Sequence, residues 1–179
     1  MNTYISILRG INVGGHKLIK MDDLKLMFTS LKFDSVKTYV QSGNIIFSTE
    51  ESNLKKLEER ISSEIKNVFG FEVPTIVMSS DTLERIIENN PLIKDPQKDI
   101  GFLYVTFLAE ILTHFDTETI LEKKQLDEEI EFTSEAIYLY CPNGYSKTKL
   151  NNNFLEAKLN TQATTRNWKT INELLRLAK

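Results

Sequence analysis

The chain has 179 residues, of which 41% are hydrophobic and 26% are charged, a balance typical of one ordinary soluble domain or of two small lobes. No apolar run approaches the roughly 20 residues that a membrane-spanning helix needs, and the N-terminus lacks a signal-peptide pattern. The single cysteine, Cys141, excludes an internal disulfide framework and suits a reducing compartment, so we expect a cytoplasmic protein.

The net charge of −3 is unevenly distributed along the chain. Residues 81–144 contain 14 acidic and 5 basic residues, whereas residues 145–179 contain 7 basic and 2 acidic residues. The basic end of the chain can supply a local anion-binding surface, and a solvated helix face explains the same lysines equally well. The acidic balance of the whole chain argues against a broad nucleic-acid groove.

The first 80 residues predict the order strand, helix, strand, strand, helix, strand. The expected strands are 3–8, 33–40, 44–48 and 71–78, and the expected helices begin near Met21 and after a cap at Ser52 or Asn53. This order is the split βαβ arrangement of a ferredoxin-like unit. Right-handed crossovers then place the first and third strands in the middle of the sheet.

The rest of the chain predicts a second, degenerate unit. A helix at 81–89 and a linker at 90–99 precede a strand, a helix, a hairpin and two helices, at 101–108, 117–126, 131–141, 150–159 and 168–178. This β-α-β-β-α-α order repeats the first unit without its final strand. We therefore expect an α+β protein with a ferredoxin-like unit at 1–80, a helix and linker at 81–100 and a second unit at 101–179, together forming one compact globule.

The loop Arg9–Lys17 (RGINVGGHK) follows the first strand and has two interpretations. Gly14 and Gly15 allow close backbone approach, so that successive N–H groups cradle an anion while Arg9 and Lys17 or Lys20 add positive charge. Alternatively, the glycines only turn the chain between strand and helix. Two aspartates, at positions 22 and 23, already occupy the first helical turn and weigh against an anion there.

Known phosphate-binding fingerprints do not fit this loop. Its glycines do not match the G-x-G-x-x-G dinucleotide pattern. The phosphate loop G-x-x-x-x-G-K-[ST] is matched only loosely, because His16 is inserted before the lysine and Leu18 replaces the hydroxyl that binds metal. A nucleoside-triphosphatase is therefore not expected.

Two further polar runs are expected to meet the loop. The turn Gln41–Asn44 offers the amides of Gln41 and Asn44 and the Ser42 hydroxyl, and its ordinary interpretation is hairpin chemistry. The predicted topology places this turn at the same sheet edge as the loop. The segment Thr164–Trp168 adds Arg166, which suits a phosphate or carboxylate, and Asn167.

Metal and nucleophile chemistry finds little support. His16, His114 and Cys141 are isolated in sequence, without the spacing of a zinc or iron site, so no metal is expected. Cys141 lies in an apolar strand and is expected to be buried. Several carboxylates, among them Asp22, Asp23 and Glu156, could act as bases, and nothing in the sequence selects one of them. The cofactor, if any, and the reaction, if any, stay unknown.

The chain resembles a bacterial family, domain-of-unknown-function family 1697. The matching stretches are RGINVGG at 9–15, a helix opened by Met21 with Leu24, TYVQSGNIIF at 38–47 and TTRNWKT at 164–170. The resemblance spans nearly the whole chain. It implies a compact cytoplasmic α+β protein with a ferredoxin-like element, and it brings no activity, cofactor or substrate.

These observations favour a site for a small anionic or phosphorylated ligand. Arg9 and Arg166 would neutralise the anion, Gly14 and Gly15 would cradle it, and polar side chains would orient or assist it, namely Asn12, Gln41, Ser42, Asn44, Asn167, Lys17 and Lys149. Two alternatives stay open: a nucleic-acid-binding module that uses the sheet and the basic end, and a protein-interaction or homo-oligomer module without catalysis.

Overall fold

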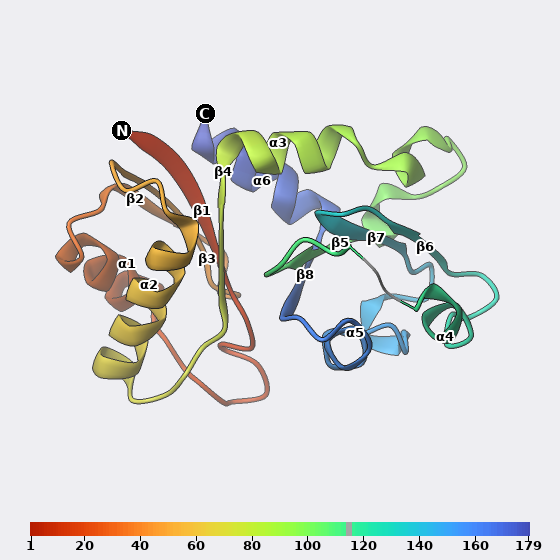
Figure 1. Cartoon of the computed structure of the whole chain (residues 1–179), viewed down its shortest axis with the longest axis horizontal. Helices are drawn as coiled ribbons and strands as arrows, with labels where there is room; N and C mark the ends of the chain where they lie inside the picture. Colours follow the sequence, from red (N-terminus) through yellow and green to blue (C-terminus); the bar gives the residue numbers. More distant parts are fainter. Residues whose placement is uncertain (114–115) are drawn as a thin grey trace. The chain divides into compact units, whose positions relative to one another are not determined.

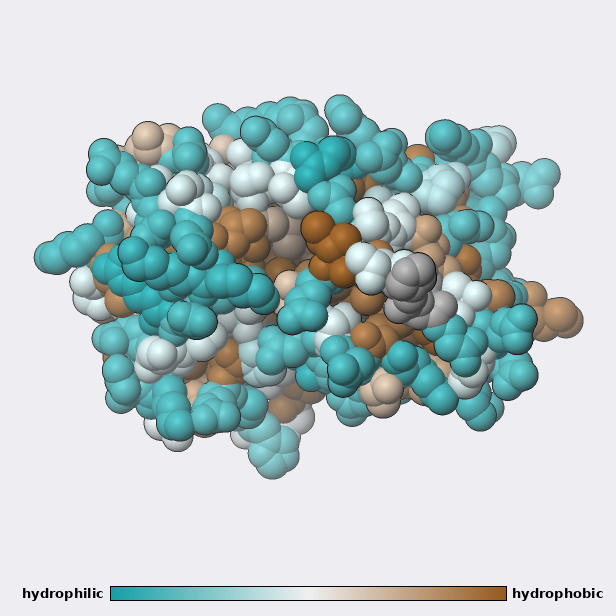
Figure 2. Space-filling view, in the orientation of Figure 1, coloured by the Kyte–Doolittle hydropathy of each residue, from teal (hydrophilic) through white to brown (hydrophobic). Residues whose placement is uncertain are grey.

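The computed structural model describes residues 1–113 and 116–179, and the chain divides into two compact units. The first unit comprises Met1–Glu84 with Glu173–Lys179, and the second comprises Arg85–Asn172. Figure 1 follows the chain from its N-terminus in red to its C-terminus in blue. None of the described helices is both long and apolar enough to cross a bilayer. Hydrophilic side chains cover most of the face drawn in Figure 2.

The first unit has the predicted ferredoxin-like topology. Its elements are β1 (Asn2–Leu8), α1 (Met21–Ser30), β2 (Asp34–Tyr39), β3 (Asn44–Thr49), α2 (Leu54–Phe69) and β4 (Thr75–Ser79), followed by the start of α3 (Ser80–Glu88). The sheet order is β2-β3-β1-β4, and each neighbouring pair is antiparallel. The expected central position of β1 and β3 is confirmed.

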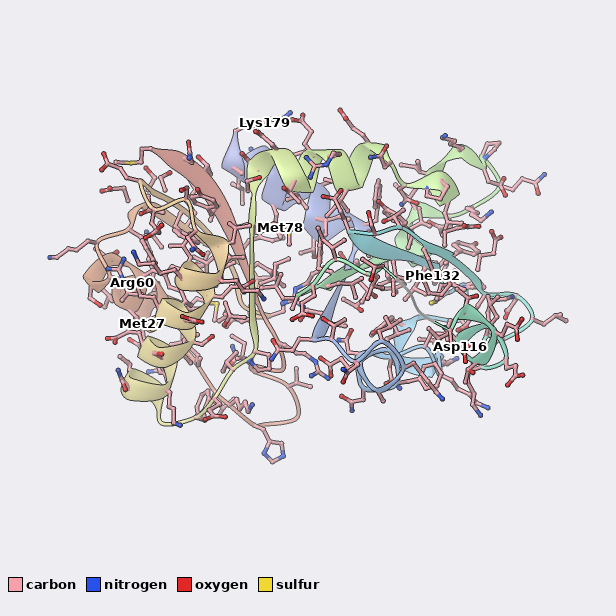
Figure 3. All side chains as sticks on the ribbon, in the orientation of Figure 1. Met27, Arg60, Met78, Asp116, Phe132 and Lys179 are labelled. Atoms are coloured by element: carbon pink, nitrogen blue, oxygen red, sulfur yellow. The ribbon has the colours of Figure 1, made fainter. Side chains whose placement is uncertain are left out.

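Helices α1 and α2 supply one core with the sheet. Leu24 and Phe28 of α1, and Leu57 of α2, belong to the same buried cluster as Phe47 of β3. This face is apolar in both helices at the 3.6-residue period, which is why the helices form and why they pack there. Cζ of Arg60 in α2, a residue labelled in Figure 3, lies 5.1 Å from the centre of the Phe33 ring, which belongs to this core, in a cation–π contact.

The second unit repeats the topology of the first. Its strands are β5 (Leu103–Leu108), β6 (Glu129–Phe132), β7 (Ala136–Tyr140) and β8 (Ala163–Asn167), and its helices are α4 (Thr117–Leu121), α5 (Asn152–Leu159) and the start of α6 (Trp168–Ala178). It also contains three short 3-10 helices, η1 (Pro91–Lys94), η2 (Ile100–Phe102) and η3 (Tyr145–Lys147). The sheet order β6-β7-β5-β8 corresponds strand by strand to that of the first unit. The α+β fold class is confirmed.

Strand β8 corrects the expectation that the second unit lacks a final strand. Its sequence, ATTRN, has one apolar residue, so no period-2 hydrophobic pattern marks it as a strand. It is a strand because it pairs antiparallel with β5, where Thr106 faces Thr165, and because Thr164 and Thr165 are buried there. Tertiary pairing, rather than local hydrophobicity, therefore determines this element.

The two units also match in their helix caps. Asn53 and Asn151 are the N-caps of α2 and α5, and each accepts the N–H three residues later at 3.1 Å. Five residues after each cap, Glu58 and Glu156 accept a backbone N–H of β4 at 3.0 Å and of β8 at 2.8 Å. The repeat therefore extends from topology to individual contacts.

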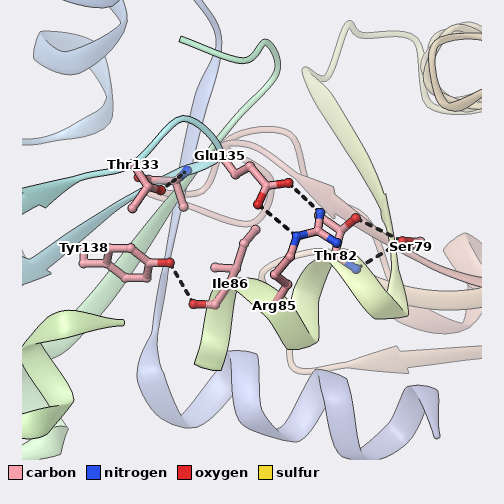
Figure 4. A network of polar contacts seen from close by, with 8 residues as sticks. Ser79, Thr82, Arg85, Ile86, Thr133, Glu135 and Tyr138 are labelled. Atoms are coloured by element: carbon pink, nitrogen blue, oxygen red, sulfur yellow. Dashed lines mark hydrogen bonds and ion pairs between the residues drawn. The ribbon is translucent and has the colours of Figure 1, made fainter. Parts of the chain in front are cut away.

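The junction between the last strand and the next helix is also repeated. In the first unit, Oγ of Ser79 accepts the N–H of Thr82 at 3.1 Å (Figure 4). In the second unit, Oδ1 of Asn167 accepts the N–H of Thr170 at 2.8 Å. Each side chain satisfies one of the free N–H groups at a helix start. The predicted site residue Asn167 thus has a capping role.

In the second unit, polar contacts connect the last turns of α3 with the β6–β7 hairpin. Arg85 donates to Glu135 from Nε at 3.2 Å and from Nη2 at 2.6 Å (Figure 4). These bonds hold the pKa of Glu135 below its usual value. The hydroxyl of the buried Tyr138 donates to the Ile86 carbonyl at 2.8 Å. Because Tyr138 is buried, this bond satisfies a polar group that burial would otherwise penalise.

A matched pair of substitutions tests the repeat. Ser6 in β1 and Thr106 in β5 occupy equivalent positions, opposite Val77 and Thr165. The buried Oγ of Ser6 has no hydrogen-bond partner among the described residues, whereas Thr106 Oγ1 lies 2.7 Å from Thr165 Oγ1. We expect Ser6→Ala to leave the free energy of unfolding unchanged or raise it by about 1 kcal/mol, and Thr106→Val to lower it by about 1 kcal/mol. Urea denaturation followed by circular dichroism measures both, and equal losses would contradict the assignment.

Candidate functional site

The connection from β1 to α1 folds back on itself as a short hairpin. Asn12 N–H donates to the Lys17 carbonyl at 3.2 Å, and His16 N–H donates to the Val13 carbonyl at 3.0 Å. At the tip, φ is 59° and 77° at two successive glycines, positions 14 and 15. Positive φ at both central residues defines a type I′ turn, which glycine adopts without strain. Turn geometry therefore accounts for both glycines.

The Asn12 side chain holds this hairpin in place. Its Oδ1 accepts the Ile19 N–H at 2.8 Å, and its Nδ2 donates to the Ile19 carbonyl at 2.9 Å. The same Nδ2 donates to the Gln41 carbonyl at 2.8 Å. Nearby, the Leu8 N–H donates to the Gly43 carbonyl at 2.8 Å. The predicted adjacency of the Arg9–Lys17 loop and the Gln41–Asn44 turn is confirmed.

The turn itself is closed by its own polar groups. Asn44 is fully buried, and its Nδ2 lies 3.0 Å from the Tyr39 carbonyl and 2.9 Å from the Ser42 hydroxyl. A Cβ at Gly43, where φ is 77°, would lie 2.7 Å from the Leu8 Cβ and from the Ile11 Cδ1. The turn therefore needs glycine both for its conformation and for its close packing.

The basic residues of the loop have structural contacts. Lys17 Nζ donates to the Glu72 carbonyl at 2.6 Å and so ties the hairpin to the connection between α2 and β4. The Arg9 N–H donates to the Pro74 carbonyl at 3.0 Å, which fixes the end of β1 beside the same connection. The loop is thus anchored at three places: by Asn12, by Lys17 and by the Arg9 backbone.

A pocket of about 430 Å³ lies where the loop, the turn and α1 meet. It is lined by Asn12, Leu18, Ile19, Lys20, Asp23, Gln41 and Phe69. Within residues 1–113 and 116–179, the side chains of Lys20, Asp23 and Gln41 form no hydrogen bond or ion pair. Lys20 is also the N-cap of α1, and its side chain caps none of the first-turn N–H groups. The pocket therefore offers a cation, an anion and an amide for a ligand.

The segment Thr164–Trp168 belongs to the second unit, where Thr165 is the centre of a hydroxyl network. Its Oγ1 lies 2.6 Å from Asn152 Oδ1, 2.7 Å from Thr106 Oγ1 and 3.0 Å from the Tyr145 hydroxyl. The amide oxygen of Asn152 can only accept, so Thr165 donates its one proton there. The other two hydroxyls must then donate to Thr165. The network is complete without a ligand.

Two other predicted residues of the second unit, Arg166 and Lys149, differ in how far they are buried. Burial lowers the pKa of Arg166 to about 10, while Tyr145 acts in the opposite direction, so the guanidinium is charged at neutral pH. Its Nη1 donates to the Thr165 carbonyl at 3.0 Å. Lys149 is exposed in the loop after η3. That Arg166, Asn167 and Lys149 share one site with the Arg9–Lys17 loop stays a prediction.

Metal and thiol chemistry find no site in the described part of the chain. There, no group of three or more His, Cys, Asp or Glu side chains could hold a metal ion. Cys141 is buried as expected, and burial raises the pKa of its thiol to about 12, with a further contribution from the charge of Glu128. It is therefore not a reactive thiolate at neutral pH. His16 is exposed, and His114 lies outside the described residues.

Comparison with known proteins identifies the family. The family described as "Protein of unknown function (DUF1697)" matches residues 1–138. The chain belongs to this family. No curated protein matches it. Among solved structures, the conserved bacterial protein SP0830 from Streptococcus pneumoniae is 26% identical, covers 99% of both chains and has a TM-score of 0.76. The predicted resemblance is confirmed, and neither description names an activity.

The sequence predicted only some of the residues that line the pocket of the DUF1697 protein. Asn12 and Gln41 were predicted as ligand-binding residues. Lys20 was named as a source of positive charge beside the loop, and Asp23 as one of several carboxylates that could act as a base. Phe69 was not anticipated as a lining residue, because it is the last residue of α2 and only tertiary packing brings it to the pocket. Its sequence signal is that of a core helix residue.

Asn12→Ala tests the three side-chain hydrogen bonds of Asn12, which together form a clamp on the loop of the DUF1697 protein. The substitution removes both bonds to Ile19 and the bond to Gln41, so we expect a loss of about 1–3 kcal/mol and faster amide exchange at Ile19. Asn12→Asp keeps an acceptor for the Ile19 N–H and loses both donated bonds. We expect it to protect the Ile19 amide better than alanine does. Hydrogen exchange by NMR measures this, and unchanged exchange in Asn12→Ala would refute the clamp.

Gly43→Ala tests the packing of the turn. The added methyl group would meet Leu8 and Ile11 at 2.7 Å, and φ is 77°, so we expect a loss of about 2–4 kcal/mol. Gly70→Ala is the matched control, because φ is 82° there and no atom lies within 4 Å of the added methyl. That control should cost about 1 kcal/mol. Equal destabilisation of the two variants in urea would show that the contacts at Gly43 are unimportant.

Proposed function

We propose that this DUF1697 protein binds a small ligand that carries an anionic group, such as a carboxylate or a phosphate, in the pocket of its first unit. The observation that carries the proposal is a hollow where the predicted loop and turn meet, lined by three polar side chains, Lys20, Asp23 and Gln41, that bond to no other residue the structure describes. Its volume of about 430 Å³ is in the range of small-molecule sites. The proposal is for binding, and it assigns no reaction.

The electrostatics of the pocket favour one negative charge rather than several. Lys20 contributes a cation, and the start of α1, which no side chain caps, contributes the positive end of a helix dipole. Asp22 and Asp23 in the first turn oppose a highly charged group. A carboxylate, or a phosphate monoanion or diester, therefore fits better than a triphosphate.

The rigidity of the loop supports the proposal. Lys20 and Ile19 follow directly on the hairpin that Asn12 fixes at both ends. A site whose backbone is already held in place loses less conformational entropy when a ligand binds. The bonds of Asn12 thus fix the backbone on which the pocket is built.

The two alternatives differ in their support. For nucleic acid, the sheet of the first unit offers no open face, because Ile5, Ile7, Ile46 and Met78 are at most 4% exposed. An interaction module is favoured by one observation: Val13 and Leu18 of the hairpin are 64% and 67% exposed. These two exposed apolar side chains offer surface that a partner could cover. Light scattering of the purified chain separates a monomer from a self-associating protein.

A thermal-shift panel of carboxylates, phosphates and nucleotides tests the proposed function. A ligand at about 100 times its Kd should add about 2.7 kcal/mol to the free energy of unfolding. Lys20→Ala should abolish the shift, because it removes the cation of the pocket. Lys25→Ala is the matched control, since Lys25 is an exposed residue of the same helix that does not line the pocket.

The outcome is decisive in both directions. A shift that Lys20→Ala removes and Lys25→Ala preserves supports the pocket as the binding site. The absence of any shift across the panel, or a shift equally sensitive to both substitutions, sinks the proposal.

A further inference from the structure

The charged side chains around the pocket have opposite signs. Lys20 and Asp23 are three residues apart at the start of α1, a spacing that places side chains on the same side of a helix. Both line the pocket, and within the described ranges neither is engaged in an ion pair. A simple anion would be attracted by Lys20 and repelled by Asp23. A simple cation would be attracted by Asp23 and repelled by Lys20.

The rest of the lining is largely apolar. Ile19 is buried, Phe69 is half-buried beside Phe71 with ring centres 6.4 Å apart, and Leu18 is exposed. Leu18 and Phe69 therefore give the pocket most of its accessible apolar wall, which a hydrocarbon group of the ligand can cover, and Ile19 closes the wall from the core side. Covering exposed apolar surface contributes favourably in proportion to its area. A ligand without an apolar part would leave this wall in contact with water.

We propose that the ligand is a small zwitterion with an apolar side chain, of the chemical class of the apolar amino acids; this rests on the proposed function of the same pocket. Its carboxylate pairs with Lys20 and its ammonium group pairs with Asp23. Its side chain packs against Leu18, Ile19 and Phe69, and the Gln41 amide donates to or accepts from the polar end. Only a ligand with both charges satisfies both side chains of the helix.

The volume of the pocket agrees with this class. At about 430 Å³ it holds a molecule of amino-acid size with room for water, and it is small for a dinucleotide. Nothing in the assignment requires a reaction, so the same pocket can serve binding, sensing or turnover of the zwitterion.

Calorimetric titration of the full-length chain with three matched compounds tests the class. L-leucine carries both charges, 4-methylpentanoate lacks its ammonium group, and 3-methylbutylamine lacks its carboxylate. L-phenylalanine and its two counterparts, 3-phenylpropanoate and phenethylamine, repeat the comparison with a larger side chain. We expect at least one of the two zwitterions to bind about tenfold more tightly than either of its counterparts.

Two substitutions assign the charges. Asp23→Asn should weaken zwitterion binding about tenfold and leave the carboxylate counterpart unchanged or tighter, since repulsion is removed. Asp22→Asn is the matched control, because Asp22 is in the same helical turn and does not line the pocket. It should change neither titration. Both residues are exposed on the helix surface, so both variants are expected to fold, and circular dichroism verifies this.

The results separate this inference from the proposed function. One result would show that the zwitterion class is wrong and that the anion site stands. In that case 4-methylpentanoate or inorganic phosphate binds as tightly as leucine, and its binding is lost in Lys20→Ala and unchanged in Asp23→Asn. If neither these compounds nor the anion panel binds, both proposals fail. Zwitterion binding that Asp22→Asn weakens as much as Asp23→Asn also overturns the inference.

Discussion

The side chain of Asn12 determines how the first unit presents its surface. A primary amide has one acceptor and two donors, and here all of them serve the backbone of Ile19 and Gln41. The amide thus replaces the strand pairing that the irregular connection between β1 and α1 lacks. It fixes the residue at which α1 begins and brings a distant turn beside it. The backbone positions of Ile19 and Gln41, two residues that line the pocket, follow from these three bonds.

The repeated scaffold shows which parts of the chain are structural. Asparagine caps, glutamates on the last strands and side-chain acceptors at the strand-to-helix junctions occur in both units. The connection after the first strand differs in length, because Arg9–Lys20 in the first unit has more residues than the stretch between β5 and α4 in the second. Contacts shared by both units serve the fold. A loop present in one unit is free to carry a function of its own.

Much of the fold could be predicted from the sequence, because several elements carry their own local signals. Helix α2 has an apolar stripe, the N-cap Asn53 and a C-terminal Gly70 with φ of 82°, and its start was predicted to within one residue. Strand β8 has no such signal, since buried threonines satisfy one another's hydroxyls in three dimensions rather than by a pattern along the chain. Prediction of the site was limited in the same way. Loop and turn were placed side by side by topology, while Phe69 became a lining residue only through packing.

The glutamates of the repeat have a consequence for association between chains. Strands β4 and β8 each end their sheet, so the backbone groups on one side of each have no strand partner in that sheet, and a foreign strand could pair there. Glu58 and Glu156 already occupy one N–H on each of these borders. An incoming strand would have to displace a bound carboxylate and then compete with its charge. The bound glutamates therefore reduce the tendency of these two edge strands to pair with other chains and to form fibrils.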